Sequence, residues 1–159
     1  MGMLPIVVVL ASFILLWGMV NYHSFVTKRK AIADTLEARR LAQIRLGDAL
    51  IPLLDVHRKY HLPIPSPLSQ LPNLTLVQRK STIEELMREA DQLLDQTSSQ
   101  SSLTPDGEFE RLRTVYGEAK KGYFLARKRH RAAVNGYNAE ARHMPSKIVA
   151  KIFGFQPSQ

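Results

Sequence analysis

The sequence predicts an all-α protein, in which a single N-terminal transmembrane helix is followed by an elongated antiparallel bundle of three or four helices. The first observation behind this prediction is the charge pattern, because all 22 Lys and Arg and all 14 Asp and Glu lie in residues 28–159. The second is the helical spacing of the apolar side chains within that charged part. The third is that no segment has a convincing strand pattern. Residues 28–159 can bury one core but are short for a two-domain enzyme.

Residues 1–27 form the predicted anchor. By count, 19 of these 27 residues are apolar, and residues 4–26 contain no Asp, Glu, Lys or Arg. As a helix this stretch would be about 35 Å long, enough to cross a hydrocarbon core of about 30 Å. We therefore expect residues 4–26 to contact the lipid bilayer. A cleaved signal peptide is an alternative, but the segment lacks its basic start and small-residue cleavage site. A buried helix of a soluble protein is another.

A basic cluster of Lys28, Arg29 and Lys30 ends the uncharged stretch. Because positive residues stay on the cytoplasmic side of a membrane, this cluster predicts a cytoplasmic body and an N-terminus outside. The cluster is also well placed to contact anionic lipid headgroups.

Residues 31–60 have the apolar spacing of a helix, which could continue directly out of the span. Pro52 is expected to kink this helix or to start a new one, because its ring removes a backbone hydrogen bond. Residues 61–80 are predicted to be a proline-rich loop, since they contain Pro63, Pro65, Pro67 and Pro72.

The next helix is predicted to begin at Ser81, where Ser81 and Glu84 have the spacing of a capping box. Apolar residues then follow on one face, and acidic side chains outnumber Arg88. A flexible serine-rich linker is expected over residues 97–104.

The longest predicted helix begins after Thr104 and runs to about Met144. Its most regular feature is a column of large residues at seven-residue intervals: Phe109, Tyr116, Tyr123, His130, Tyr137 and Met144. A companion column contains small residues, which predicts a close-packed helical seam of the coiled-coil type.

A short apolar segment follows Pro145 and ends in Phe153, Gly154 and Phe155. We expect it to pack on the bundle as a cap. The alternative is an interfacial foot that lies on the bilayer.

Two stretches carry a resemblance to a known family. The C-terminal stretch contains Tyr137 and Asn138, then a Pro-Ser turn and an apolar helix ending in Phe-Gly-Phe: Pro145, Ser146, Phe153, Gly154 and Phe155. Upstream, Leu50, Ile51 and Pro52 form a second element. With the N-terminal span, these motifs resemble the LemA family, and residues 28–159 are then similar to its helical bundle.

The resemblance implies a single-pass protein of the bacterial inner membrane with no established enzymatic activity. Some relatives are associated with building magnetosome membranes, which points to scaffolding. The sequence departs from the family pattern at Leu62, where the family has glutamate, and at His130-Arg131, where it has a tyrosine-asparagine pair. The chain therefore looks like a divergent or shortened member.

Candidate chemistry is sparse. The chain has no Cys, which excludes disulfides and thiolate sites. His57 and His61 have helical i, i+4 spacing that could begin a zinc site of a metal-dependent enzyme, but no third ligand is spaced nearby. His130 falls in the seam, where we expect a packed or edge histidine; a pH-sensitive residue of the bundle is the alternative. We expect no enzymatic activity, no cofactor, no metal and no small-molecule substrate.

The formal net charge of +8 favours a solvated basic helix face, densest at Arg127-Lys128-Arg129 and Arg131. We expect no nucleic-acid binding, because no recognisable module accompanies these residues. The leading hypothesis is a membrane-anchored, non-enzymatic scaffold that binds protein partners or copies of itself. The alternative is a protein that senses or shapes anionic membranes through its basic helix faces.

Overall fold

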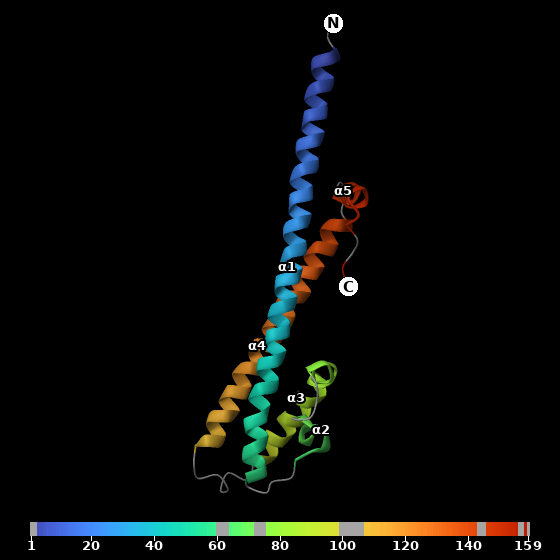
Figure 1. The fold of residues 1–159 in the computed structure, drawn as a ribbon. Coiled ribbons are helices and arrows are strands. Elements are labelled where there is room, and N and C mark those ends of the chain that lie inside the picture. Colours follow the sequence, from blue (N-terminus) through green and yellow to red (C-terminus); the bar gives the residue numbers. More distant parts are fainter. Residues whose placement is uncertain are drawn as a thin grey trace. The chain divides into compact units, whose positions relative to one another are not determined.

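The computed structural model describes residues 3–59, 64–71, 76–98, 107–142, 146–155 and 158. This part of the chain forms helices and no strand, which confirms the all-α prediction (Figure 1). The helices are α1 (Met3–Lys59), α2 (Ser66–Ser69), α3 (Leu76–Ser98), α4 (Glu108–Arg142) and α5 (Ser146–Ile152). The chain divides into two compact units. Unit 1 contains Met1–Glu37 and Lys128–Gln159, and unit 2 is Ala38–Arg127, so that α1 and α4 contribute to both.

The first part of α1 contains the predicted span. Among the described residues, α1 is the one helix that is long and apolar enough to cross a membrane. Its side chains are exposed throughout residues 6–16, although Val, Leu, Ile and Phe dominate this stretch. An apolar helix that its own fold leaves uncovered is compatible with a membrane anchor.

α1 also runs without a break through Pro52 to Lys59, so the alternative of a new helix starting there is wrong. Pro52 cannot donate a hydrogen bond to the carbonyl of Asp48. Both residues lie on the exposed side of α1, where water can bond that carbonyl. Leu50 and Leu53, on the buried side, are fully covered, and their packing favours a continuous helix.

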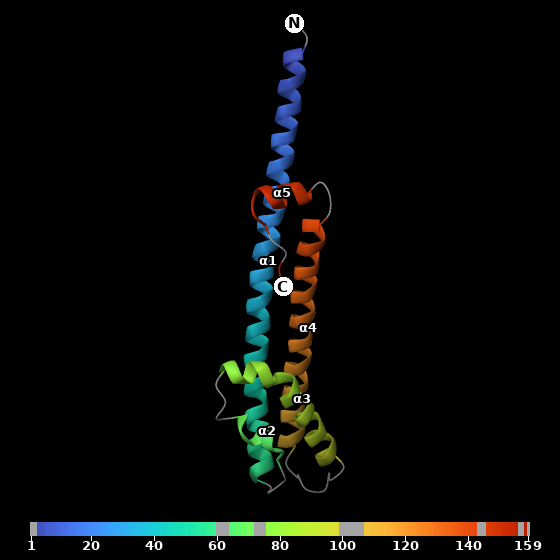
Figure 2. The ribbon, with the colours of Figure 1, turned by 90° about the vertical axis from the view of Figure 1, so that its right-hand side faces the viewer.

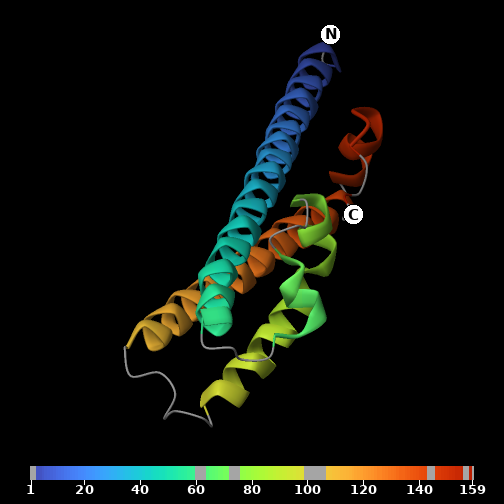
Figure 3. The same cartoon turned by 60° about the horizontal axis from the view of Figure 1, so that its bottom comes forward.

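Unit 2 is a helical bundle built from the second part of α1, α2, α3 and the first part of α4. Its core is a leucine-rich cluster with aromatic residues from α4, and its fully or almost fully buried members include Leu46, Leu50, Leu53, Leu54, Leu68, Leu71, Leu86, Leu93, Tyr116 and Tyr123. α2 packs on α3 (Figure 3). Leu68 and Leu71, from the stretch predicted as a loop, are completely buried in this core.

The helix directions in unit 2 follow from cross-helix contacts. Lys59 at the end of α1 forms an ion pair with Glu108 at the start of α4. Glu84, near the start of α3, forms one with Arg127, far along α4. α4 is therefore antiparallel to both α1 and α3, and these two helices run in the same direction (Figure 2). The predicted antiparallel arrangement thus holds for α4 but not for the pair of α1 and α3.

Two predicted boundaries need correction. α3 begins at Leu76, so Ser81 lies inside the helix, and residues 61–80 are not all loop because they also contain α2. Residues 76–80 contain no Pro or Gly, and nothing in them opposes the extension of the helix. α3 includes residues 97 and 98 of the predicted linker; residues 99–104 lie outside the described residues.

Unit 1 consists of the first part of α1, the last part of α4, and α5. Its small core is formed by Phe25, Tyr137, Ala141, Val149 and Ala150. α5 lies beside α1 (Figure 2), and the burial of its Val149 and Ala150 is the packing expected of a cap.

The predicted column of large residues on α4 is mostly buried. Phe109, Tyr116 and Tyr123 lie in the core of unit 2, and Tyr137 lies in that of unit 1. His130 is half-buried, and Met144 lies outside the described residues. The seven-residue spacing therefore marks the packed face of α4, while a true coiled coil stays a prediction.

Candidate functional site

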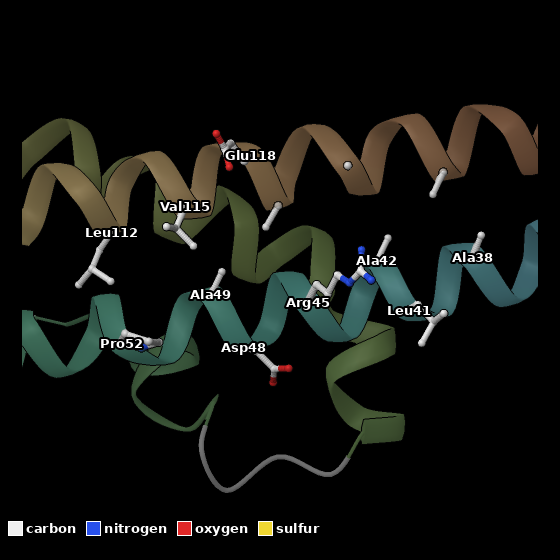
Figure 4. A pocket seen from close by; sticks show the side chains of 13 residues that line it. Ala38, Leu41, Ala42, Arg45, Asp48, Ala49, Pro52, Leu112, Val115 and Glu118 are labelled. Atoms are coloured by element: carbon white, nitrogen blue, oxygen red, sulfur yellow. The ribbon is translucent and has the colours of Figure 1, made fainter.

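Unit 2 has an open groove between α1 and α4, with a volume of about 820 Å³ (Figure 4). We call it the α1–α4 groove. Six of its thirteen lining residues are small, namely Ala38, Ala42 and Ala49 of α1 and Ala119, Gly122 and Ala126 of α4. Leu41 and Val115 add exposed apolar surface.

The spacing of these small residues explains why the groove exists. They recur at intervals of three, four or seven residues along α1 and α4, which places them on one face of each helix. The large residues on the neighbouring faces, such as Leu46 and Tyr116, pack into the core of unit 2. Large side chains therefore fill the side covered by α3, whereas small ones leave the α1–α4 groove open.

Charged residues of both signs line the α1–α4 groove. Figure 4 shows Arg45 between the two helices, with Asp48 on the outer side of α1 and Glu118 on the outer side of α4. All three side chains are exposed. Within the described part of the chain, none of them forms an ion pair. These charges are available to a partner that lies in the groove.

On its other face, α4 is fixed to α3 by a polar network around Tyr116. The buried hydroxyl of Tyr116 donates to Asp91 Oδ1 at 3.1 Å, and Lys120 Nζ donates to Asp91 Oδ2 at 2.5 Å. Burial raises the pKa of Tyr116, and the Asp91 carboxylate raises it further, because both disfavour a phenolate. The network satisfies a polar group in the core and helps to hold α4 beside α3, one helix of the groove wall.

His57, a candidate zinc ligand in the sequence, is completely buried in unit 2. Its Nδ1 lies 2.8 Å from the carbonyl oxygen of Leu53, and its ring packs edge-on against Phe109. Burial lowers the pKa of His57. His61 lies outside the described residues. Within the described ranges, no group of three or more His, Asp or Glu could hold a metal ion.

Unit 1 contains an aromatic cluster at the end of the uncharged part of α1. It comprises Tyr22, Phe25, Tyr137, Phe153 and Phe155. Phe155 stacks on Phe25 with ring centroids 5.0 Å apart, and Phe153 lies 5.1 Å from Tyr22. Tyr137 meets Phe25 edge-on at 5.9 Å. The cluster joins α1, α4 and the residues after α5.

The geometry of this cluster gives physical roles to the motif residues. Gly154 has a φ of +70°, a conformation that favours glycine, and it lets the chain reverse after α5. The N–H of Phe155 then donates to the carbonyl of Ala150 at 2.8 Å. The side-chain amide of Asn138 makes paired hydrogen bonds of 2.8 and 2.9 Å with the backbone of Ser158. These bonds hold the last part of the chain against α4.

The basic cluster that follows the predicted span, Lys28, Arg29 and Lys30, is divided between two environments. Lys28 forms an ion pair with Glu140, whose other carboxylate oxygen accepts a hydrogen bond from Ser24 at 2.7 Å. Arg29 and Lys30 are exposed. Glu140 was not predicted as the partner of Lys28. Its signal in the sequence is that the seven-residue column of small residues on α4, Ala119, Ala126 and Ala133, has Glu140 at its next position.

The other motif residues lie in different places. Leu50 is buried in unit 2, Ile51 is half-buried and Pro52 lines the α1–α4 groove. Ser146 is the first residue of α5, and Pro145 lies outside the described residues. The structure thus brings the C-terminal motif residues together in unit 1, while the Leu-Ile-Pro element belongs to unit 2.

His130, the remaining titratable residue of the seam, lies in unit 1. Its Nδ1 is 3.2 Å from the hydroxyl oxygen of Thr35 on α1. The ring therefore packs between α4 and α1, as the sequence analysis expected for this position.

Comparison with known proteins gives one family. The LemA family model matches residues 68–159, more than half of the chain. The matched range includes α3, α4, α5 and the C-terminal motif, and this confirms the resemblance seen in the sequence. No curated protein and no solved structure matched the chain.

Proposed function

Because this chain belongs to the LemA family, we propose that it is a non-enzymatic, single-pass membrane scaffold whose copies associate through the α1–α4 groove. The observation that carries the proposal is the groove itself, an open apolar surface beside exposed charges of both signs. In this proposal the anchor confines the copies to one membrane, and the groove joins them.

The proposed location is the bacterial inner membrane, with the N-terminus outside and the body in the cytoplasm. The exposed apolar side chains at residues 6–16 of α1 support insertion into lipid. The exposed Arg29 and Lys30 support a cytoplasmic body, because basic residues next to a span stay on that side.

A second copy is the occupant that the groove suits best. Copies with the same anchor have the same orientation, so a two-fold axis along the helices would bring identical levels of the groove together. At such a contact, Arg45 of one copy could face Glu118 or Asp48 of the other. The small residues allow close approach of two backbones, and anchoring raises the effective concentration of the copies.

The composition of the groove supports a non-enzymatic role. Its floor consists of alanines and one glycine, which carry no reactive group, and its carboxylates, Asp48 and Glu118, lie on the outer sides of the two helices (Figure 4). A surface of this kind is suited to helix packing.

Cysteine crosslinking in native membranes tests the proposal. The chain has no natural Cys, so a single introduced thiol reports one position. Gly122, in the groove, and Gly136, outside it, are both helical residues of α4, and a Cβ at either meets nothing within 4 Å. Gly122→Cys and Gly136→Cys are therefore a matched pair that should leave the fold intact.

With a bifunctional maleimide, we expect Gly122→Cys to give a covalent dimer and Gly136→Cys to stay largely monomeric. Equal dimer yields at the two positions would indicate random collision in the membrane. Equal yields, or no dimer from Gly122→Cys, would contradict association through the groove.

A further inference from the structure

The outer face of α5 is apolar and uncovered. α5 buries Val149 and Ala150 in the core of unit 1, whereas its other large apolar side chains are exposed. Ile148 is 49% exposed, Ile152 is 71% exposed and Phe153, just after the helix, is 55% exposed. A segment of this length that exposes three large apolar residues has a surface suited to an apolar environment.

The position of this face indicates which environment covers it. Phe153 contacts Tyr22, and Phe155 contacts both Tyr22 and Phe25, within unit 1. Tyr22 lies in the last part of the uncharged stretch of α1, before Lys28. The exposed face of α5 is therefore next to the place where the predicted span ends.

The depth of this position can be worked out from the helix rise. If residues 4–26 span the bilayer, Leu15 lies at its centre, and Tyr22 is seven residues further along. At 1.5 Å per residue, Tyr22 lies about 10 Å from the centre, which is about 5 Å inside the edge of a 30 Å hydrocarbon core. This is the depth at which interfacial helices bury their apolar faces.

Basic side chains accompany this apolar face. Lys147 and Lys151 are exposed and lie one turn apart on α5. Long basic side chains at this depth can extend their charged ends to the headgroups while their stems stay in apolar surroundings. Both the apolar and the charged residues of α5 thus fit the same boundary.

We propose that α5 is a second membrane contact, an interfacial helix that inserts Ile148, Ile152 and Phe153 into the bilayer boundary beside the span. The proposal rests on the membrane anchoring in the proposed function. It is independent of the α1–α4 groove and of self-association. The aromatic cluster gives it a mechanical role, because α5 is fixed to α1 and would hold unit 1 at the membrane surface.

Depth-dependent quenching tests this proposal with the full chain in lipid vesicles that contain an anionic lipid. Single cysteines at Ile152, Leu15 and Gly136 carry an environment-sensitive fluorophore, and the vesicles contain lipids with a quencher at a shallow or a deep acyl position. Leu15→Cys reports insertion of the anchor. Gly136→Cys is the matched control, because Gly136 is an exposed position of unit 1 on α4.

We expect the Ile152→Cys label to shift to the blue and to be quenched more by the shallow than by the deep quencher. The Leu15→Cys label should show the reverse preference, and the Gly136→Cys label, on the exposed side of α4, should be less blue-shifted and less quenched than the Ile152→Cys label. Ile148→Cys should repeat the Ile152→Cys result, which guards against a local effect of one label.

The possible failures are distinguishable. If Leu15→Cys is quenched but Ile152→Cys and Ile148→Cys stay water-like, the interfacial helix is overturned while the anchor stands. A blue-shifted label at Ile152 that lipid quenchers do not reach would mean that protein covers α5, which also overturns the proposal. An unquenched Leu15→Cys label would overturn the anchor, and the interfacial helix with it.

Discussion

The buried imidazole of His57 connects the chemistry of one residue to the stability of unit 2. Its Nδ1 is 2.8 Å from the carbonyl oxygen of Leu53, and no part of the residue is exposed to solvent. Burial lowers its pKa, because a buried site takes the protonated ring out of water and so disfavours the charged form. The folded state therefore holds the neutral form to a lower pH than the unfolded state does.

This difference predicts a pH-dependent free energy of unfolding. The contribution of neutral His57 is fully present above about pH 6.5, the ordinary pKa of histidine. As the pH falls below that value the unfolded state binds the proton first, so stability decreases until the lowered pKa of the folded state is passed. The slope from one histidine is at most about 1.4 kcal/mol per pH unit.

Chemical denaturation of the full chain in detergent, followed by circular dichroism between pH 7.5 and 5, measures this effect. His57→Leu should lose the extra slope that the unmodified chain shows below pH 6.5. His130→Leu is the control and should keep it, because His57 still titrates there. An identical slope with and without His57 would contradict this account.

At the scale of the element, α1 is one continuous helix although Pro52 lies in its interior. Proline in a helix interior is about 3 kcal/mol less favourable than alanine, part of which is offset by the stiffer unfolded chain. Pro52→Ala should therefore raise the free energy of unfolding by about 2 kcal/mol. Gly136→Ala gives a calibration on α4, with an expected gain of about 0.5–1 kcal/mol. A Pro52→Ala variant that is less stable than the unmodified chain would show that the fold needs this proline.

The attachment of α5 to α1 gives a second prediction for an element. Phe25 is completely buried, so Phe25→Ala should cost about 3–5 kcal/mol. Phe155 stacks on Phe25 with an interplanar angle of 17°, and a double-mutant cycle of the two should show about 0.5–1.5 kcal/mol of coupling. Phe153→Ala, at an exposed position, should change stability much less. Zero coupling between Phe25 and Phe155 in denaturation experiments would mean that the stacking is not formed in solution.

The existence and type of the long helices could be predicted from the sequence because apolar periodicity reports burial directly. The buried tyrosines of α4 follow the predicted seven-residue column for this reason. The boundary at Ser81 could not be predicted correctly, since a capping-box pattern inside a helix looks the same as one at its start. Whether α1 continues through Pro52 depends on the tertiary packing of Leu50 and Leu53. Rules that use only the local sequence do not include this packing.

The candidate sites were predictable only in part, for the same physical reason. The C-terminal motif could be recognised, but its contacts with Tyr22 and Phe25 join residues more than 100 positions apart. The ion pair of Lys28 with Glu140 could not be predicted for the same reason, because Glu140 belongs to another helix, α4. The α1–α4 groove appeared in the sequence only as a column of small residues, and that column was interpreted as part of a closed seam.

At the scale of the whole molecule, the fold pairs some of the basic side chains that direct sensing of anionic lipid would use with its own acidic residues, which the net charge of +8 already counts. Lys28, Lys120 and Arg127 form ion pairs with acidic residues of the fold. The exposed features that call for a partner are the apolar α1–α4 groove and the outer face of α5. We propose that a second copy covers the α1–α4 groove and that lipid covers the outer face of α5.

Step counting by single-molecule photobleaching in native membrane vesicles tests the central proposal most directly. The full chain with one fluorophore per copy should bleach in two steps. Gly122→Leu, which fills the groove, should bleach in one step, and Gly136→Leu should still bleach in two. One-step bleaching of the unmodified chain, or equal step counts for Gly122→Leu and Gly136→Leu, would contradict a scaffold that associates through the α1–α4 groove.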